Sequence, residues 1–461
     1  MKYSVTFREE DYEALVAHLF SYGDSERAAY LLCRPSISEN ETRLIVKEII
    51  PVQDHEVAES SRAHMIIPSL SFRHVLKRAD ETKQCFVFVH SHPPEIPYHS
   101  EQDNSEERKM FKTTYIRVST KGVHGSIVIS SPTNPQGRVW FEDGTSTLIE
   151  VIRTIGKKFR FFSDAIAFST NNIQLFDRQI RAFGSDTQRL LGNLTIGIIG
   201  VGGTGSSVAE QLIRLGVGHL IISDGQKLEG SNVNRVYGSR VSDDGTLKVK
   251  LIERLARDTG TGTEVTSIEN DITYEAVMRK FRDCDIIFGC TDDEWGRSIL
   301  NKFAVYYLIP VFDLGVKVTS ENETIKYVEG RVTTLLPGEA CLICRGRINP
   351  KNVLSESLEA TNQEEARKLR KEGYIPELAE PAPAVVPFTT TIAAASISEL
   401  LHRLTGYLGS DRVSSELIYQ FHYSKIRTNR IASKPDCMCI DPVFIGRADS
   451  VPFLDLTWRP E

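Results

Sequence analysis

Residues 195–206 read TIGIIGVGGTGS, and this stretch decides the fold of the larger part of the 461-residue chain. Its apolar start predicts a β-strand, and the glycine-rich run after it predicts a tight turn that opens a helix. Gly200, Gly202 and Gly205 have the spacing G-x-G-x-x-G, in which missing β-carbons let the backbone approach a phosphate closely. Gly203 lies in the same turn. We therefore expect a doubly wound α/β fold with a nucleotide at this turn.

The residues after the turn favour ATP over a dinucleotide. A second strand-like run, HLIISD, ends on Asp224, where a carboxylate can hydrogen-bond a ribose hydroxyl. Polar and cationic side chains that suit a triphosphate follow at Asn232, Arg235 and Lys248. A later apolar run ends near Asp292, whose carboxylate is placed to hold Mg2+ beside the phosphates. A dehydrogenase has no need for this combination.

A second reactive stretch, HSHPPEIPYHSEQD, covers residues 90–103. His90 and His92 flank one residue, so the end of a β-strand can point both imidazoles to the same side. With Asp103 they offer three ligands to Zn2+ and leave the fourth position to water. Zinc makes such a water nucleophilic near neutral pH, and a nearby carboxylate can move its proton. We expect a catalytic zinc site here.

Four of the eight cysteines form two close pairs. They are Cys341 with Cys344, and Cys437 with Cys439. Four thiolates make a closed tetrahedral site, so we expect a structural zinc ion; free reduced thiols are the alternative. The other four, Cys33, Cys85, Cys284 and Cys290, lie in or beside apolar runs and are expected in the core. This usage favours a reducing compartment over disulfide bonds.

Composition is that of an ordinary globular enzyme of two or three domains, with 41% hydrophobic and 25% charged residues. A net charge of −6 and a pI near 6.1 give no basic footprint for nucleic acid. The charged N-terminus lacks a signal-peptide core, and no apolar run is long enough to span a bilayer. We expect a cytoplasmic protein that binds neither nucleic acid nor membrane.

The stretch of residues 90–103 resembles the JAMM motif of JAB/MPN-domain metalloproteases, H-x-H-x7-S-x2-D, at every fixed position. The resemblance implies an N-terminal α/β domain with zinc-dependent peptidase activity. It also implies that Glu26, which precedes an apolar strand-like run, is the general acid/base. Ser100 would help to stabilise the oxyanion on the scissile carbonyl.

From about residue 172 onward, the motifs resemble those of the ThiF/MoeB adenylyltransferases and their ubiquitin-activating relatives. The resemblance implies a Rossmann-like adenylation domain in which residues 200–205 form the ATP loop and Asp224 contacts the ribose. Asn232, Arg235 and Lys248 would surround the phosphates, and Asp292 would bind Mg2+. The segment FDRQIRAFG matches one that lends an arginine, here Arg178, to the partner subunit's ATP, which implies a homodimer. One departure is Gln226, because the family often has a second acid two residues after the ribose aspartate.

We expect the N-terminal domain over residues 1–150, a helical connection over 151–171 and the adenylation domain over 172–461. Residues 345–387 are expected to form a mobile, solvated crossover loop, followed by an apolar helix over 386–406. The conjugating branch of the family forms a thioester on a crossover cysteine, and this loop contains none. The adenylate would then be handed on, or another protein or nucleophile would take the acyl group; no loop serine or threonine stands out for an oxyester.

These resemblances imply a bifunctional enzyme of a bacterial ubiquitin-like protein system. It would cleave after a ubiquitin-like C-terminal tail and adenylate that terminus, in a pathway with a conjugating enzyme such as those linked to antiviral defence. The alternative is an adenylyltransferase and processing protease for a sulfur-carrier protein in sulfur or cofactor metabolism. A third possibility, an N-terminal domain that only binds, is disfavoured by the complete ligand set.

Overall fold

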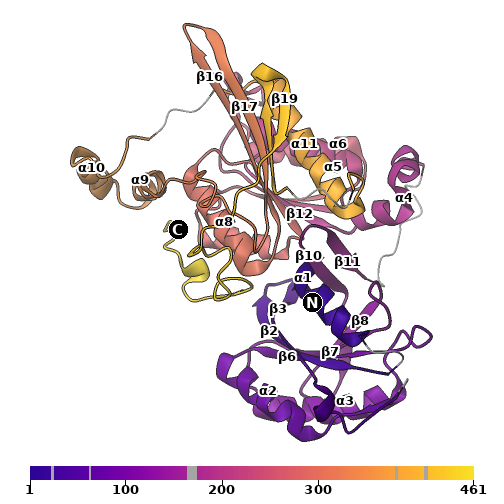
Figure 1. The fold of residues 1–461 in the computed structure, drawn as a ribbon. Coiled ribbons are helices and arrows are strands. Elements are labelled where there is room, and N and C mark those ends of the chain that lie inside the picture. Colours follow the sequence, from indigo (N-terminus) through magenta and orange to yellow (C-terminus); the bar gives the residue numbers. More distant parts are fainter. Residues whose placement is uncertain (22–24, 62–63, 164–173, 379–382, 410–413, 461) are drawn as a thin grey trace. The chain divides into compact units, whose positions relative to one another are not determined.

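The structure is a computed structural model that describes the chain except for residues 22–24, 62–63, 164–173, 379–382, 410–413 and 461. The chain divides into two compact units (Figure 1). The N-terminal unit comprises Met1–Ala165 with two short later segments, Tyr306–Leu308 and Ile445–Ser450. The rest of the chain forms the C-terminal unit.

The N-terminal unit is built on a nine-stranded mixed sheet in the order β11-β10-β1-β3-β2-β6-β7-β8-β9. Its strands are β1 (Lys2–Arg8), β2 (Ala28–Ile37), β3 (Glu41–Pro51), β6 (Cys85–Ser91), β7 (His124–Ile129), β8 (Pro135–Trp140), β9 (Ser146–Leu148), β10 (Val151–Ile155) and β11 (Phe159–Phe162). A separate two-stranded sheet pairs β4 (Glu59–Ser61) with β5 (His64–Ile66). The helices are α1 (Glu9–Leu19), α2 (Ser69–Thr82) and α3 (Glu101–Arg117).

Alternation of side chains along the strands gives this sheet two apolar faces, each covered by helices. On one face, α1 packs with Leu15 against a core that includes Leu31 and Val87. On the other face, α2 and α3 pack against a core that includes Phe86 and Trp140. Because Phe86 and residue 90 are separated by an even number of positions on β6, residue 90 faces α2 and α3.

The expected helical connection over residues 151–171 is wrong at its start. Residues 151–155 form β10, which pairs with β1 in parallel, and residues 159–162 form β11, which pairs with β10. The β-branched and aromatic residues of VIRTI and FRFF gain more from sheet burial than from a helix. The N-terminal sheet therefore extends past residue 150, and residues 164–171 lie outside the described part of the chain.

The C-terminal unit contains an eight-stranded sheet in the order β14-β13-β12-β15-β16-β17-β18-β19. Its strands are β12 (Thr195–Ile199), β13 (His219–Ser223), β14 (Glu264–Ile268), β15 (Ile286–Gly289), β16 (Val311–Glu321), β17 (Thr324–Leu335), β18 (Glu416–Gln420) and β19 (Lys425–Thr428). Strands β12 to β16 are parallel, and the last three are antiparallel to their neighbours. The chain moves outward from β12 in one direction and then in the other, which confirms the doubly wound α/β fold.

Helices cover both sides of this sheet, with α5, α6 and α11 on one side and α8 on the other (Figure 1). The helices of this unit are α4 (Asp177–Leu191), α5 (Gly203–Leu215), α6 (Lys248–Thr259), α7 (Glu275–Lys280), α8 (Glu294–Tyr307), α9 (Pro350–Thr361), α10 (Gln363–Lys371) and α11 (Val386–Thr405). The expected apolar helix after the crossover is confirmed as α11, which ends at Gly406 in a left-handed conformation.

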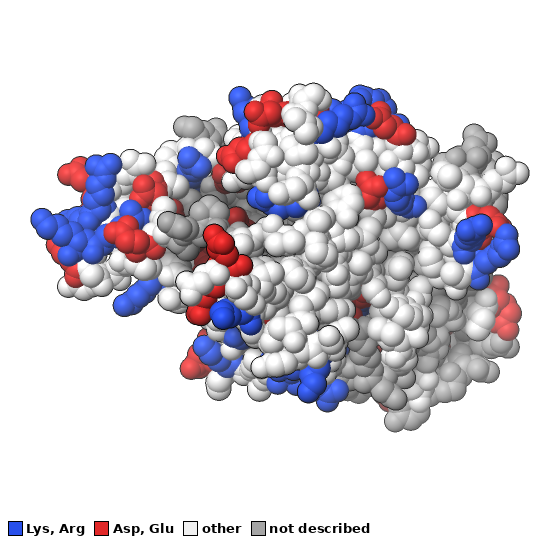
Figure 2. Space-filling view, turned by 90° about the horizontal axis from the view of Figure 1, so that it is seen from above, with Lys and Arg blue, Asp and Glu red and all other residues white. Residues whose placement is uncertain are grey.

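The expected crossover loop over residues 345–387 is largely helical, because it contains α9 and α10. Local capping explains the difference. Asn349 accepts a hydrogen bond from the backbone of Lys351 at 3.0 Å, and Asn362 accepts one from the backbone of Glu365 at 3.2 Å. An N-cap residue stabilises a helix by about 1 kcal/mol. Figure 2 shows the charged side chains of this helical pair as a mixed red and blue cluster at the left of the view.

Two glutamates hold α9 against the start of α8. The carboxylate of Glu356 accepts the backbone N–H of Trp295 at 2.7 Å, and the carboxylate of Glu294 accepts the amide of Asn352 at 2.6 Å. Each carboxylate thereby lies at the positive end of the opposite helix, where a negative charge is favoured. Within the described residues, no helix is long and apolar enough to cross a membrane.

Candidate metal and nucleotide sites

The pairing of β2 with β6 brings Glu26 to the two histidines. Ala28 stands opposite His90 in this antiparallel pair. Because the two chains run in opposite directions, Glu26, two residues before Ala28, comes opposite His92, two residues after His90. The carboxylate of Glu26 lies 3.8 Å from Nε2 of His92, and its side chain is buried.

The side chains of His90, His92 and Asp103 converge within the reach of one metal ion. The two Nε2 atoms are 3.1 Å apart, and they lie 3.3 Å and 3.4 Å from the carboxylate oxygens of Asp103. A tetrahedral ion with bonds of about 2.0–2.1 Å separates its ligand atoms by about 3.3 Å. The three ligand atoms therefore fit zinc without rearrangement.

Asp103 reaches this position from the first turn of α3. Ser100 is the N-cap of that helix, and the two residues form a capping box. The carboxylate of Asp103 accepts hydrogen bonds from the Ser100 backbone at 2.6 Å and from its hydroxyl at 2.7 Å. Ser100 thus orients the carboxylate in this structure, while its expected role at an oxyanion stays a prediction.

The outer nitrogens of the two imidazoles differ in their surroundings. Nδ1 of His92 donates to the carbonyl of Ile96 at 3.1 Å, which leaves its Nε2 as the metal-facing atom. Nδ1 of His90 is buried and has no hydrogen-bond partner among the described residues. Burial raises the pKa of Asp103, but hydrogen bonds and charges from His90 and His92 outweigh burial and hold it well below its usual range. The same contacts raise the pKa of His92, although burial opposes them.

Three residues beside this site were missed by sequence reasoning. His99, Glu107 and Arg138 form a buried polar network behind the histidines. Burial first, and then the charge of Arg138, lower the pKa of His99 to about 2, so its imidazole is neutral. The signal in the sequence is weak: Glu107 follows Asp103 at helical spacing, but nothing local points to Arg138, which lies on β8.

The glycine-rich turn joins β12 to α5 with the geometry of a phosphate loop. Gly200 has a φ of +82°, a left-handed conformation that favours glycine. A β-carbon on Gly205 would lie 1.8 Å from the carbonyl oxygen of Gly200, so no larger residue fits there. By contrast, a β-carbon on Gly202 would meet nothing within 4 Å, so the turn is open on that side. Gly203 begins α5, whose N-terminus faces this opening.

Asp224, Gln226 and Lys248 form a connected group at the end of β13. The carboxylate of Asp224 accepts the backbone N–H groups of Val201 at 2.9 Å and Gln226 at 2.8 Å. Burial raises the pKa of Asp224. The side-chain amide of Gln226 accepts the ammonium of Lys248 at 2.6 Å, and Lys248 is buried. A glutamine at this position therefore keeps Lys248 in place without neutralising its charge.

The remaining predicted nucleotide residues lie around the same turn. Arg235 packs against Gly203 and donates to the amide oxygen of Asn232 at 3.3 Å. Asp292 is exposed, follows β15, and acts electrostatically on Asp224. Strands β12 and β15 are neighbours at the point where the strand order reverses, which is where open α/β sheets bind ligands.

Arg178 is not brought into this group. It lies exposed on the first turn of α4 and makes no hydrogen bond or ion pair to the other nucleotide-site residues that the structure describes. Its expected role in a partner subunit's site stays a prediction.

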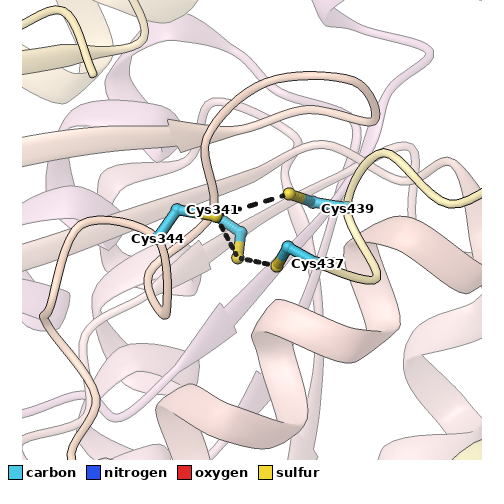
Figure 3. A group of neighbouring side chains, drawn as sticks. All are labelled: Cys341, Cys344, Cys437 and Cys439. Carbon is cyan, nitrogen blue, oxygen red and sulfur yellow. Dashed lines mark hydrogen bonds between the residues drawn. The ribbon is translucent and has the colours of Figure 1, made fainter. Parts of the chain in front are cut away.

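The four paired cysteines come together in one buried cluster (Figure 3). The sulfur of Cys341 lies 3.8 Å from that of Cys344 and 3.4 Å from that of Cys437, and Cys344 lies 3.8 Å from Cys439. Four sulfurs at about 2.3 Å from zinc are separated by about 3.8 Å, so the cluster fits a closed tetrahedral ion.

The other four cysteines are buried as expected, except that Cys290 is only partly so. Cys33, Cys85 and Cys284 are fully buried, and Cys290 is partly exposed. Burial raises the pKa of Cys85 to about 12 and that of Cys33 well above its usual range. Burial and the nearby Asp313 carboxylate likewise raise the pKa of Cys290. Thiols in such surroundings are poor nucleophiles.

Comparison with known proteins assigns both units to families. Residues 176–439, more than half of the chain, match the ThiF family, and residues 8–137 match prokaryotic homologs of the JAB domain. The chain therefore belongs to the ThiF family and carries an N-terminal JAB-like domain.

Two relatives and one solved structure illustrate the similarity. The chain is 30% identical over 172 residues to ubiquitin-like modifier-activating enzyme 5 of Branchiostoma floridae, which covers 34% of this chain and 40% of that protein. It is 33% identical over 154 residues to the sulfur carrier protein ThiS adenylyltransferase of Bacillus subtilis (strain 168). This match covers 33% of this chain and 46% of that protein. The chain thus spans less than half the length of these two relatives. The crystal structure of E. coli MccB with ATP aligns with a TM-score of 0.45 and 18% identity over 61% of this chain and 77% of that one.

We predict that the purified chain contains two zinc ions, one at each cluster. Cys344→Ser should remove one ion and Asp103→Ala the other, because a site that loses one ligand binds zinc much more weakly. Metal analysis of the wild type and of both variants measures this directly. A Cys344→Ser variant that keeps both ions would contradict the four-cysteine site.

Proposed function

We propose that this chain is a bifunctional enzyme of a bacterial ubiquitin-like protein system. One unit would cleave after the C-terminal tail of a ubiquitin-like protein, and the other would adenylate that terminus with ATP. The observation that carries the proposal is the presence, in one chain, of a His90–His92–Asp103 cluster with Glu26 beside it and of an ATP-type turn with Asp292 nearby.

Peptide cleavage at the first site rests on Glu26. A zinc ion held by His90, His92 and Asp103 would supply a polarised water. The buried carboxylate of Glu26 lies close enough to that position to accept the proton of the water and pass it to the leaving amine. The reaction matures the small protein when a short extension is attached to its tail, and releases it from a conjugate when a second protein is attached there.

Adenylation at the second site joins two anions, so it needs cations and Mg2+. A carboxylate oxygen of the tail attacks the α-phosphorus of ATP, an acyl-phosphate bond forms, and pyrophosphate leaves. Lys248 and Arg235 would neutralise the phosphates, Asp292 would hold Mg2+, and Asp224 would contact the ribose. The open side of the turn at Gly202 leaves room for the phosphates.

The positions of the cysteines indicate what happens to the adenylate after it forms. Residues 345–387 contain no cysteine, and the four cysteines outside the metal cluster are buried or have a raised pKa. We therefore propose that the adenylate is handed on, to a conjugating enzyme of the same pathway. The same observation fits a second candidate, a sulfur-carrier pathway in which a sulfur nucleophile attacks the adenylate, and the Bacillus subtilis relative supports it.

A homodimer would complete the ATP site with Arg178 from the partner. The outward face of α11 supports this assembly, because its exposed residues Thr391, Ala394 and Ser398 carry no charge. The two charged residues of the helix, Glu399 and Arg403, are buried and pair with each other at 2.9 Å. A 20-residue helix with an uncharged outer face is suited to packing against a second copy.

We predict that Glu26→Gln abolishes cleavage after a ubiquitin-like tail but keeps the zinc ion. The loss should be at least about a hundredfold, since the variant cannot accept a proton from the water. Cleavage of a tail-extended small protein, measured by intact mass together with zinc content, tests this. Glu59→Gln, an exposed glutamate on β4, is the matched control. Unchanged proteolysis in Glu26→Gln would refute the assignment.

We predict that Asp292→Asn removes ATP–pyrophosphate exchange while proteolysis continues. Loss of the carboxylate weakens Mg2+ at the phosphates but does not touch the metal cluster of the other unit. The exchange assay uses the small protein with a free C-terminal carboxyl, and Asp258→Asn, an exposed change on α6, is the control. If the wild type binds NAD and exchanges with no small protein, the adenylation proposal fails.

Mixing two inactive variants tests the shared site. Arg178→Ala and Asp292→Asn should each lack exchange, yet a mixed dimer has one site with both residues intact. Random mixing should restore about a quarter of the wild-type rate. Arg181→Ala, one turn further along α4, should keep full activity by itself. Absence of any recovery in verified mixed dimers would show that Arg178 acts within its own subunit, and full exchange in Arg178→Ala alone would place Arg178 outside the ATP site.

A further inference from the structure

Helix α3 carries a second buried acid, one turn after the proposed zinc ligand Asp103. Glu107 follows Asp103 at a spacing of four, so both side chains lie on the same face of the helix. The side chain of Glu107 is 3% exposed, although it lies near the start of an otherwise polar helix. The proposed cleavage reaction gives this carboxylate no role.

Glu107 is held by three residues of β7 and β8. Its Oε2 atom accepts Nη2 and Nε of Arg138 at 2.8 Å and 3.0 Å, and Nε1 of Trp140 at 2.9 Å. The hydroxyl of Ser126 donates to the same oxygen. Ser126 and Arg138 face each other in the β7–β8 pair, so one rigid part of the sheet supplies these donors.

Arg138 also contacts a second residue of α3. Nη1 of Arg138 donates to the side-chain oxygen of Asn104, the residue directly after Asp103. Arg138 therefore bridges two positions of α3, one directly after Asp103 and one a turn further along the helix. The position of the Asp103 carboxylate relative to His90 and His92 depends on how the first turn of α3 packs against the sheet.

His99 links the network to the histidines. Its Nε2 lies 3.2 Å from the hydroxyl of Ser126 and 3.7 Å from Oε1 of Glu107, and its ring stands 6.4 Å from that of His90. Oε1 of Glu107 and Nδ1 of His90 are both buried, and neither has a hydrogen-bond partner among the described residues. Buried polar atoms of this kind are rare, and in metalloproteins the outer nitrogen of a ligating histidine usually has an acceptor.

We infer that Glu107, through Arg138 and α3, is a positioning residue that orients Asp103 for metal binding. The inference rests on the zinc site of the proposed function and adds residues to it. A buried carboxylate–guanidinium pair is weak evidence for stability, because desolvation offsets much of its attraction. Its fixed geometry, by contrast, suits the orientation of a ligand.

The test compares Glu107→Gln with Glu106→Gln, its exposed neighbour on the same helix. Zinc affinity is measured by competition with a chelator, and the visible spectrum of the Co2+-loaded chain reports the ligand geometry. We expect Glu107→Gln to bind zinc about 10–100-fold more weakly and to change the Co2+ spectrum. Glu106→Gln should match the wild type in both. Wild-type affinity and spectrum in a folded Glu107→Gln variant would overturn the inference.

Two milder variants keep the inference testable if Glu107→Gln does not fold. Ser126→Ala and Trp140→Phe each remove one hydrogen-bond donor to Glu107. Both retain most of the packing, and the phenyl ring of Trp140→Phe can still stack on Phe111. Each should lower zinc affinity several-fold, and Ser126→Ala, which deletes a single oxygen, should do so with little change in the melting temperature of the apo protein. A fall in melting temperature with unchanged zinc affinity would show a structural role only and overturn the inference. A wild-type chain that binds no zinc at the histidines would instead refute the proposed peptidase site.

Discussion

Strand pairing is the constraint on which both candidate sites depend. In the N-terminal unit, the antiparallel pair of β2 and β6 places Glu26 opposite His92, and a shift of one residue would turn Glu26 to the other face of the sheet. In the C-terminal unit, the parallel pair of β12 and β15 brings the glycine turn and Asp292 to the same edge. The reactive side chains lie at strand ends or in the first turns of helices, where backbone hydrogen bonds fix their positions before any ligand arrives.

The two proposed activities have compatible chemistry. A peptidase that cuts after a ubiquitin-like tail produces a free carboxylate, and an adenylation site consumes one. One similar protein is named as a sulfur carrier adenylyltransferase and another as a ubiquitin-like modifier-activating enzyme, and these names correspond to the two pathways proposed for this chain. What distinguishes the pathways is the nucleophile that receives the acyl group, and the crossover segment of this chain lacks the cysteine that would do so.

That crossover segment is more ordered than its composition indicates. Its polar composition, rich in Glu and Lys, predicted a solvated loop, yet Asn349 and Asn362 cap two helices within it. Hydrogen bonds of Glu294 and Glu356 connect α9 to the first turn of α8. This turn follows Asp292 and Asp293 directly in the chain. Composition averages over a segment, whereas capping depends on single residues at helix ends.

The sequence by itself determined those features that depend on local spacing. The glycine turn, the His90–His92 pair and helix α11 could all be predicted, because strand alternation and helix periodicity act over a few residues. The strands β10 and β11 could not, since β10 pairs with β1, which lies about 150 positions earlier, and β11 pairs in turn with β10.

Only the tertiary structure decided which distant residues meet. It brought two cysteine pairs together across 96 positions, placed Glu26 beside His92, and set Arg138 of β8 behind the helix that carries Asp103. It also gave Gln226, which stands where the family often has an acid, a hydrogen-bond partner in Lys248. These contacts arise from long-range strand pairing and helix packing, and no local pattern in the chain encodes them.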